Sequence, residues 1–167
     1  DRRVKVVIGT RRWLGPEWTH IDADSTSLHA EDGSHHPVDI VCDARKIKLP
    51  DRCAELVYSQ ECLEHIPWGE YQSVLKEWAR LVAPGGRLRI EVPDFLAACR
   101  QVLETDTLEM DRAIQQIIFG GQANQYDFHY TGLTPRMLTE DMEKAGLKVV
   151  DVRRGWEHGH LLVEGER

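Results

Sequence analysis

Four positions with ligand-binding chemistry each follow a short apolar run that is typical of a β-strand. They are Gly9, Asp22, Asp43 and Ser59, which follow the runs Val4–Ile8, Trp18–Ile21, Val38–Cys42 and Glu55–Tyr58. A carboxylate can accept hydrogen bonds from a ligand, and a glycine lets a ligand approach the backbone. If the four runs are parallel strands, their carboxyl ends meet at one edge of the sheet, where ligands bind in open α/β folds. Turn chemistry also favours these residue types, so each position alone is open to a structural interpretation.

A histidine that could act as a general base lies in a separate segment. His129 belongs to the stretch Gly120–Gly132, which has no regular period and is long enough to be a binding loop or lid. Imidazole exchanges protons near neutral pH. We therefore predict that His129 is the catalytic base, the alternative being a loop histidine that only packs or hydrogen-bonds.

The elements that position these residues alternate between strands and helices. Helical periodicity predicts helices at 70–82, 95–104, 108–119 and 134–145, the first stopped by Pro84-Gly85-Gly86. Further strands are expected at Leu88–Val92, Val149–Val152 and Leu161–Val163. This order indicates a layered α/β fold, and without a repeat or linker we expect one domain over residues 1–167.

Composition narrows the class of partner. The chain has 167 residues, 41% of them hydrophobic, and a formal net charge of −7. A net negative charge gives no general attraction to nucleic acid, and no apolar run is long enough to span a membrane. The cysteines are widely spaced, as in a cytoplasmic protein with reduced thiols. We therefore expect a small-molecule or protein partner, and homo-oligomerisation stays open.

The ordered motifs resemble those of class I methyltransferases, particularly the small type-11-like group of S-adenosylmethionine-dependent enzymes. The matching segments are 7–9, 15–22, 39–44, 49–51, Leu63-Glu64-His65-Ile66 and Leu81-Val82-Ala83-Pro84-Gly85-Gly86-Arg87-Leu88. They cover nearly the whole chain. The resemblance implies a Rossmann-like class I methyltransferase fold, with a mostly parallel seven-stranded sheet, an antiparallel last strand and helices on both faces.

The resemblance also implies roles for individual residues. Those assigned to S-adenosylmethionine are Gly9, Thr10, Asp22, Asp43, Ala44, Ser59 and Gln60. Gly9 would let the methionyl part approach the backbone, and Asp22 would accept hydrogen bonds from both ribose hydroxyls. Asp43 and the Ala44 amide would face the adenine. Ser59 and Gln60 would face the amino-acid end of the cofactor and the bound substrate.

The first loop departs from the family pattern. It reads Gly9-Thr10-Arg11-Arg12-Trp13, where the family usually has two or three glycines. This departure motivates an alternative, a non-catalytic nucleotide-binding or partner-binding protein that retains the fold. No Gly-x-Gly-x-x-Gly is present, which disfavours a nicotinamide-dependent oxidoreductase.

We interpret the remaining polar clusters as structural and not as functional sites. Glu61-x-x-Glu64-His65 is similar to the divalent-ion site of small-RNA 2′-O-methyltransferases, which a distant histidine completes, and such ligands suit Mg²⁺ or Mn²⁺. Because Leu-Glu-His is common in the wider family, we expect no metal and a packing role for His65. Glu91 alternates with Arg87 and Arg89 and is interpreted as part of a structural ion pair. His35-His36 is interpreted as a solvated loop pair.

The methyl acceptor is the least determined part of this prediction. Ser59-Gln60 lacks the Asn-Pro-Pro-Tyr type of motif found in base-amino methyltransferases, so neither motif nor charge favours nucleic acid. We therefore expect a small-molecule or saccharide acceptor, methylated at oxygen, nitrogen or carboxylate.

Overall fold

The computed structural model describes residues 4–25, 28–155 and 159–167. The elements of the main sheet, in chain order, are β1 (Val4–Ile8), β2 (Trp18–Asp22), β5 (Ile40–Val41), β6 (Ala54–Gln60), β7 (Val82–Pro93), β8 (Lys148–Gly155) and β9 (His160–Glu166). The helices are η1 (Leu63–His65), α1 (Tyr71–Leu81), α2 (Phe95–Thr105), α3 (Leu108–Phe119) and α4 (Pro135–Lys144). A second, two-stranded sheet pairs β3 (Leu28–His29) with β4 (His35–His36).

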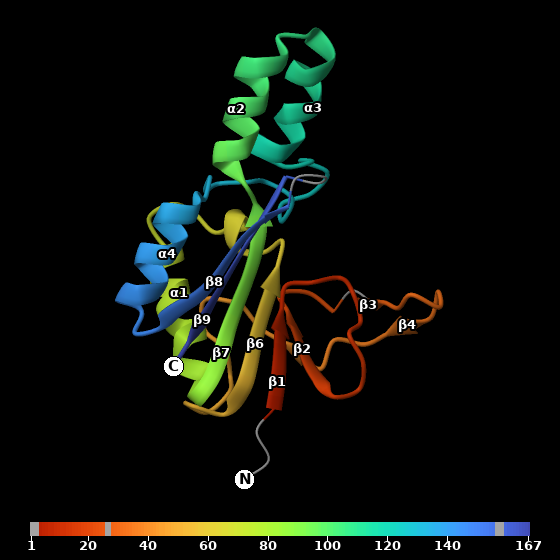
Figure 1. Cartoon of the computed structure of the whole chain (residues 1–167). Coiled ribbons are helices and arrows are strands. Elements are labelled where there is room, and N and C mark those ends of the chain that lie inside the picture. The colour runs from red at the N-terminus through yellow and green to blue at the C-terminus, as the bar shows by residue number, and fades with distance from the viewer. Residues whose placement is uncertain (1–3, 26–27, 156–158) are drawn as a thin grey trace.

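The strand order of the main sheet is β5-β2-β1-β6-β7-β9-β8. β1 pairs in parallel with β2 and β6, and β6 pairs in parallel with β7, whereas β9 runs antiparallel to β7 and β8. The carboxyl ends of β1, β2, β5 and β6 therefore meet at one edge (Figure 1). This arrangement confirms the predicted α/β fold with its antiparallel last strand.

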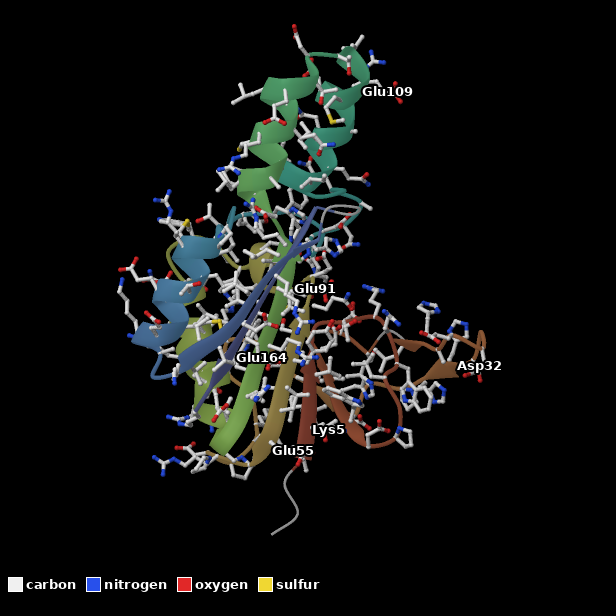
Figure 2. All side chains as sticks on the ribbon, viewed as in Figure 1. Lys5, Asp32, Glu55, Glu91, Glu109 and Glu164 are labelled. Carbon is white, nitrogen blue, oxygen red and sulfur yellow. The ribbon has the colours of Figure 1, made fainter. Side chains whose placement is uncertain are left out.

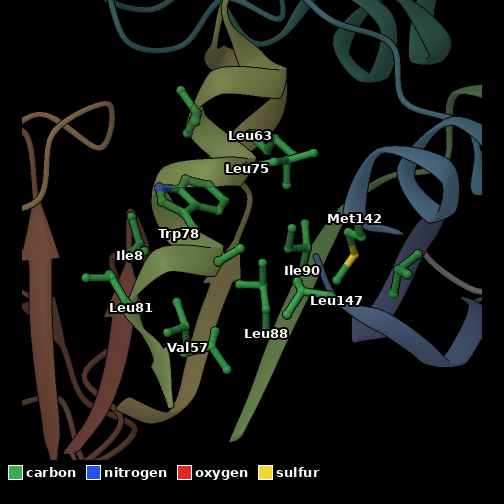
Figure 3. Packing of buried hydrophobic residues seen from close by; sticks show 14 of the residues in the cluster. Ile8, Val57, Leu63, Leu75, Trp78, Leu81, Leu88, Ile90, Met142 and Leu147 are labelled. Carbon is green, nitrogen blue, oxygen red and sulfur yellow. The ribbon is translucent and has the colours of Figure 1, made fainter. Parts of the chain in front are cut away.

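One face of the sheet carries the hydrophobic core under α1 and α4. Trp78 of α1 is fully buried among aliphatic side chains of the strands, and its indole nitrogen donates to the carbonyl of Ala44 at 2.9 Å (Figure 3). On α4, Leu138 and Met142 are buried on the face that packs against the core. A hydrogen bond from the Tyr71 hydroxyl to Asp141 joins the two helices. The helical periodicity of the sequence thus predicted the positions of both helices correctly.

Helices on both faces were expected, and this part of the prediction is wrong for the described residues. α1 and α4 lie on the same face, while α2 and α3 form a hairpin that projects beyond the sheet (Figure 1). Residues 9–17 between β1 and β2 form no helix, and the chain between β2 and β5 is used by the β3–β4 hairpin. The connections that would carry helices on the second face are therefore short or extended.

Polar and charged side chains occupy the second face instead (Figure 2). The Tyr58 hydroxyl donates to Glu91 at 2.8 Å, and His160 lies 3.0 Å from the same carboxylate. The Glu164 carboxylate is 4% exposed and accepts from Arg87 and Arg89 at 2.6 and 2.7 Å. Parallel strands are usually apolar on both faces because helices cover them. The paired charges allow this face to meet water.

The ion pairs of Glu164 with Arg87 and Arg89 predict that the free energy of unfolding depends on pH. Burial raises the pKa of Glu164, but hydrogen bonds from Arg89 and Arg87 more than offset it, so the net pKa lies below the usual range. A lowered folded-state pKa contributes stability above the unfolded pKa that is lost as pH falls through the folded pKa. Urea unfolding from about pH 7 to about pH 3 should show a smaller acid loss for Glu164→Gln than for the parent. An equal loss in both proteins would contradict this role.

Several boundaries differ from those expected. Pro84, Gly85 and Gly86 lie within β7 instead of a turn, because Val82 already pairs with Ala54 of β6. The strand expected at Val38–Cys42 is reduced to Ile40–Val41. Within the described ranges no helix is both long and apolar enough to cross a bilayer.

Candidate functional site

A cavity of about 740 Å³ lies at the carboxyl edge of the sheet. It is lined by residues at the ends of β1, β2, β5 and β6, and also by residues 124–127 and Tyr130. Of the residues predicted to hold the cofactor, those that line it are Gly9, Thr10, Asp22, Asp43, Ala44 and Gln60. The segment Gly120–Gly132, expected to be a binding loop, therefore does border the same cavity.

Gly9 is required by its surroundings as well as by its backbone. Its φ is +73°, and its amide donates to the carbonyl of Ile21 at 2.9 Å. A Cβ at this position would lie 2.4 Å from the sulfur of Cys62. The turn after β1 is thus held close to the turn after β6, and only glycine fits between them.

The arginine-rich loop is extended and packs on the β3–β4 hairpin. The amide of His29 donates to the carbonyl of Arg11 at 2.8 Å, and the amide of Trp13 donates to the carbonyl of His29 at 3.0 Å. The Trp13 ring stacks on His36 with centroids 3.7 Å apart. The loop that departs from the family's glycine-rich pattern is therefore held against this hairpin. His36 is therefore half-buried in a stack, which corrects the interpretation of His35-His36 as a solvated pair.

Asp22 has spare capacity to accept hydrogen bonds. Its side chain accepts a long hydrogen bond from the Asp24 amide, at 3.4 Å. Burial raises the pKa of Asp22 above the usual range. A partly buried carboxylate with few donors around it is suited to accept hydroxyl protons from a ligand that enters the cavity.

Asp43 is held by an arginine that the sequence analysis did not single out. Arg45 donates to both oxygens of the Asp43 carboxylate, at 2.9 and 2.6 Å, and also contacts Glu70 at 2.9 Å. The hydrogen bonds from Arg45 lower the pKa of Asp43, so this carboxylate stays ionised. The backbone amide of Arg45 also donates to this carboxylate at 2.8 Å, so Arg45 already occupies most of its acceptor sites. The Asp-x-Arg spacing is the only sequence signal for this pair.

Ser59 is the predicted cofactor residue that does not line the cavity. It is fully buried on the helical face of β6 and its hydroxyl has no hydrogen-bond partner. Val57 and Ser59 share that face because side chains alternate along a strand, which turns Gln60 to the opposite side. The sequence placed the strand end at Tyr58, whereas β6 continues to Gln60, so Ser59 belongs to the strand and not to the loop after it.

The two histidines near the cavity contact each other. His65 lines the cavity, whereas His129 does not, and their ring centroids are 4.9 Å apart. Burial, followed by the nearby His129, lowers the pKa of His65, so its ring favours the neutral form. The expected packing role of His65 is therefore combined with exposure to the cavity. The assignment of His129 as catalytic base stays a prediction, with its ring set back from the lining.

Comparison with known proteins agrees with this geometry. A family described as a methyltransferase domain matches residues 9–90. A chain from the complex between the Haloferax volcanii Trm112 methyltransferase activator and a methyltransferase has a TM-score of 0.63 at 15% identity, covering 98% of this chain and 82% of that chain. No curated protein matches this chain.

Two further solved structures share the fold. The Burkholderia thailandensis 1,6-didemethyltoxoflavin-N1-methyltransferase, with bound 1,6-didemethyltoxoflavin and S-adenosylhomocysteine, has a TM-score of 0.58 at 16% identity, covering 99% of this chain and 72% of that chain. An S-adenosylmethionine dependent methyltransferase from Mesorhizobium loti has a TM-score of 0.62 at 11% identity, covering 98% and 90%. Identities this low indicate a common fold and do not transfer a substrate.

Proposed function

Because the chain belongs to the class I S-adenosylmethionine-dependent methyltransferases, we propose that residues 1–167 act as one domain that methylates a small-molecule or saccharide acceptor. The main support for this proposal is that Gly9, Asp22 and Asp43, from three separate strand ends, line one cavity. Its volume of about 740 Å³ falls within the range of ligand pockets. The 1,6-didemethyltoxoflavin of the Burkholderia structure supports a small-molecule acceptor.

The residues present fit S-adenosylmethionine. Asp22 has acceptor capacity for the ribose hydroxyls, and Asp43 and Ala44 line the part of the cavity proposed for adenine. Gly9 and Thr10 would lie along the methionyl part, and Gln60 would reach its amino-acid end. Ser59, buried away from the cavity, would act through packing instead of direct contact.

S-adenosylmethionine held by these residues would supply an electrophilic methyl group to the acceptor atom. The protein must therefore orient the acceptor, exclude water and receive the acceptor proton where one is lost. The wall formed by residues 124–127 and Tyr130 is in the place to orient the acceptor. His129 is the proposed proton acceptor, and it would need to reach the cavity past His65.

Calorimetric titration of the protein with S-adenosylmethionine, S-adenosylhomocysteine and NADH tests this proposal. We expect both sulfur nucleotides to bind with one site per chain and NADH to give no saturable heat, because the cavity lacks a glycine-rich pyrophosphate loop. Absence of binding by either sulfur nucleotide would overturn the proposal. Binding without methylation of any acceptor in a broad small-molecule screen would favour the non-catalytic alternative.

A further inference from the structure

Three side chains from distant parts of the sequence converge at the wall of the cavity nearest residues 124–130. Glu64 and His65 belong to η1, and His129 follows α3. One potential ligand atom from each lies within 4.8 Å of the others. The amides of Tyr130 and Thr131 donate to the carbonyl of Glu64 at 2.8 and 3.2 Å, which holds the two segments together. These backbone hydrogen bonds therefore hold the three side chains close together.

Both imidazoles are oriented so that one nitrogen lone pair is free. The Nδ1 of His65 lies 3.0 Å from the carbonyl oxygen of Phe128, and the Nδ1 of His129 lies 2.8 Å from the carbonyl oxygen of Ile117. A carbonyl oxygen can only accept, so each Nδ1 is the protonated nitrogen and each Nε2 keeps its lone pair. Metal-ligating histidines are typically oriented by this kind of backbone contact.

Glu64 supplies an observation independent of the histidines. Its side chain is 3% exposed, and neither carboxylate oxygen has a hydrogen-bond partner among the described residues. One of these oxygens lies 3.9 Å from the Nε2 of His65. Leaving a buried polar group unpaired is costly, and more so when it is charged. The carboxylate therefore lacks the partner that a purely structural residue would have.

Glu61 places a second carboxyl group beside this cluster. One oxygen of Glu61 is also buried without a hydrogen-bond partner, although His160 lies 3.7 Å from it. Two adjacent carboxylates require either a shared proton or a cation. The Nε2 lone pairs of the two imidazoles supply further ligand atoms for a cation beside these carboxylates.

We propose that Glu64, His65 and His129 bind a divalent transition-metal ion, with Glu61 as an additional carboxylate. Two imidazoles with carboxylates suit Mn²⁺, Fe²⁺, Co²⁺ or Zn²⁺, whereas Mg²⁺ and Ca²⁺ prefer oxygen ligands alone. His65 and Glu61 line the cavity, so the ion borders the space on the side of residues 124–130. Its position at the acceptor end rests on the proposed function. In this arrangement the Nε2 of His129 is a ligand and no longer a general base.

Titration of the chelator-treated protein with Co²⁺, followed by calorimetry, tests the site. We expect one Co²⁺ per chain, with Mg²⁺ binding about tenfold or more weakly. Glu64→Gln, His65→Gln and His129→Gln should each weaken Co²⁺ binding by about tenfold or more. His35→Gln, a histidine on the exposed β4 strand, is the matched control and should leave the affinity within about twofold. Co²⁺ binding that persists in all three site variants would overturn the proposal.

Two further measurements distinguish loss of the metal site from unfolding of a variant and from failure of the proposed function. Metal-free Glu64→Gln should unfold at a temperature at least equal to that of the metal-free parent, because an isosteric amide removes a buried charge. Co²⁺ should then raise the melting temperature of the parent only. S-adenosylhomocysteine should bind the metal-free parent and His129→Gln equally. S-adenosylhomocysteine could bind both proteins equally while no protein form binds Co²⁺, with or without this nucleotide. In that case the proposed metal site is wrong and the proposed function stands.

Discussion

Replacing Asp22 with alanine is expected to weaken S-adenosylhomocysteine binding by at least about tenfold while leaving the melting temperature nearly unchanged. Asp22 lines the cavity and accepts a long hydrogen bond from the Asp24 amide. Hydrogen bonds from ligand hydroxyls to a carboxylate contribute roughly 1.5–3 kcal/mol each, and the variant loses them. Removing the side chain costs the fold little, because burial already disfavours its charged form and raises its pKa. Calorimetry and thermal unfolding measure the two effects separately.

Asp24→Ala is the matched control for this variant. Asp24 also lines the cavity, and replacing it with alanine removes the same formal charge. Its carboxylate, however, lies 3.7 Å from the Arg11 guanidinium in a solvent-exposed pair. Exposed pairs of this kind contribute roughly 0–1 kcal/mol. We expect the control to change the affinity by less than about threefold. Equal losses in both variants would indicate a general charge effect and would overturn the ribose assignment of Asp22.

Replacing Gly9 with alanine is expected to destabilise the fold by about 2–5 kcal/mol. The left-handed backbone contributes about 1–2 kcal/mol of this cost, and forcing a methyl group against Cys62 contributes about 1–3 kcal/mol. The added Cβ would lie 2.4 Å from the Cys62 sulfur and 2.6 Å from its Cβ, so the turns after β1 and β6 must separate. Urea unfolding followed by tryptophan fluorescence measures the change, and S-adenosylhomocysteine affinity should fall with it.

Gly33→Ala separates the two contributions. Gly33 lies in the β3–β4 turn with a φ of +83°, and a Cβ there meets no atom within 4 Å. It therefore carries the backbone strain alone, and we expect a loss of about 1–2 kcal/mol. If Gly9→Ala cost no more than Gly33→Ala, the close approach of the two turns would not be what requires glycine at position 9.

Local patterns were sufficient for most of the elements. Alternation or helical spacing extends over a whole segment, so it predicted α1, the core of β7 and α4 correctly, and Thr134 and Pro135 marked the start of α4. The β3–β4 hairpin was missed because its strands are two residues long and are stabilised by pairing with residues 11–13. No periodicity can develop over two residues.

The cofactor wall was predictable because the residues that follow parallel strands reach the same edge. Ser59 was assigned wrongly to the lining, since a shift of one residue along a strand exchanges the two faces. The uncovered second face was also missed, although Arg87, Arg89 and Glu91 had been correctly interpreted as paired charge. Whether a connection forms a helix depends on its contacts with other segments as well as on its length.

The sequence by itself determined most of the strands and helices of the main sheet and their order, because these depend on neighbouring residues. Only the tertiary structure decided that His129 lies against Glu64 and His65, since chain closure between η1 and the segment after α3 is set by the backbone hydrogen bonds of Tyr130 and Thr131. It likewise decided that Gly9 touches Cys62. Contacts between residues far apart in sequence leave no periodic signal, and the chemistry at the acceptor end of the cavity depends on those contacts.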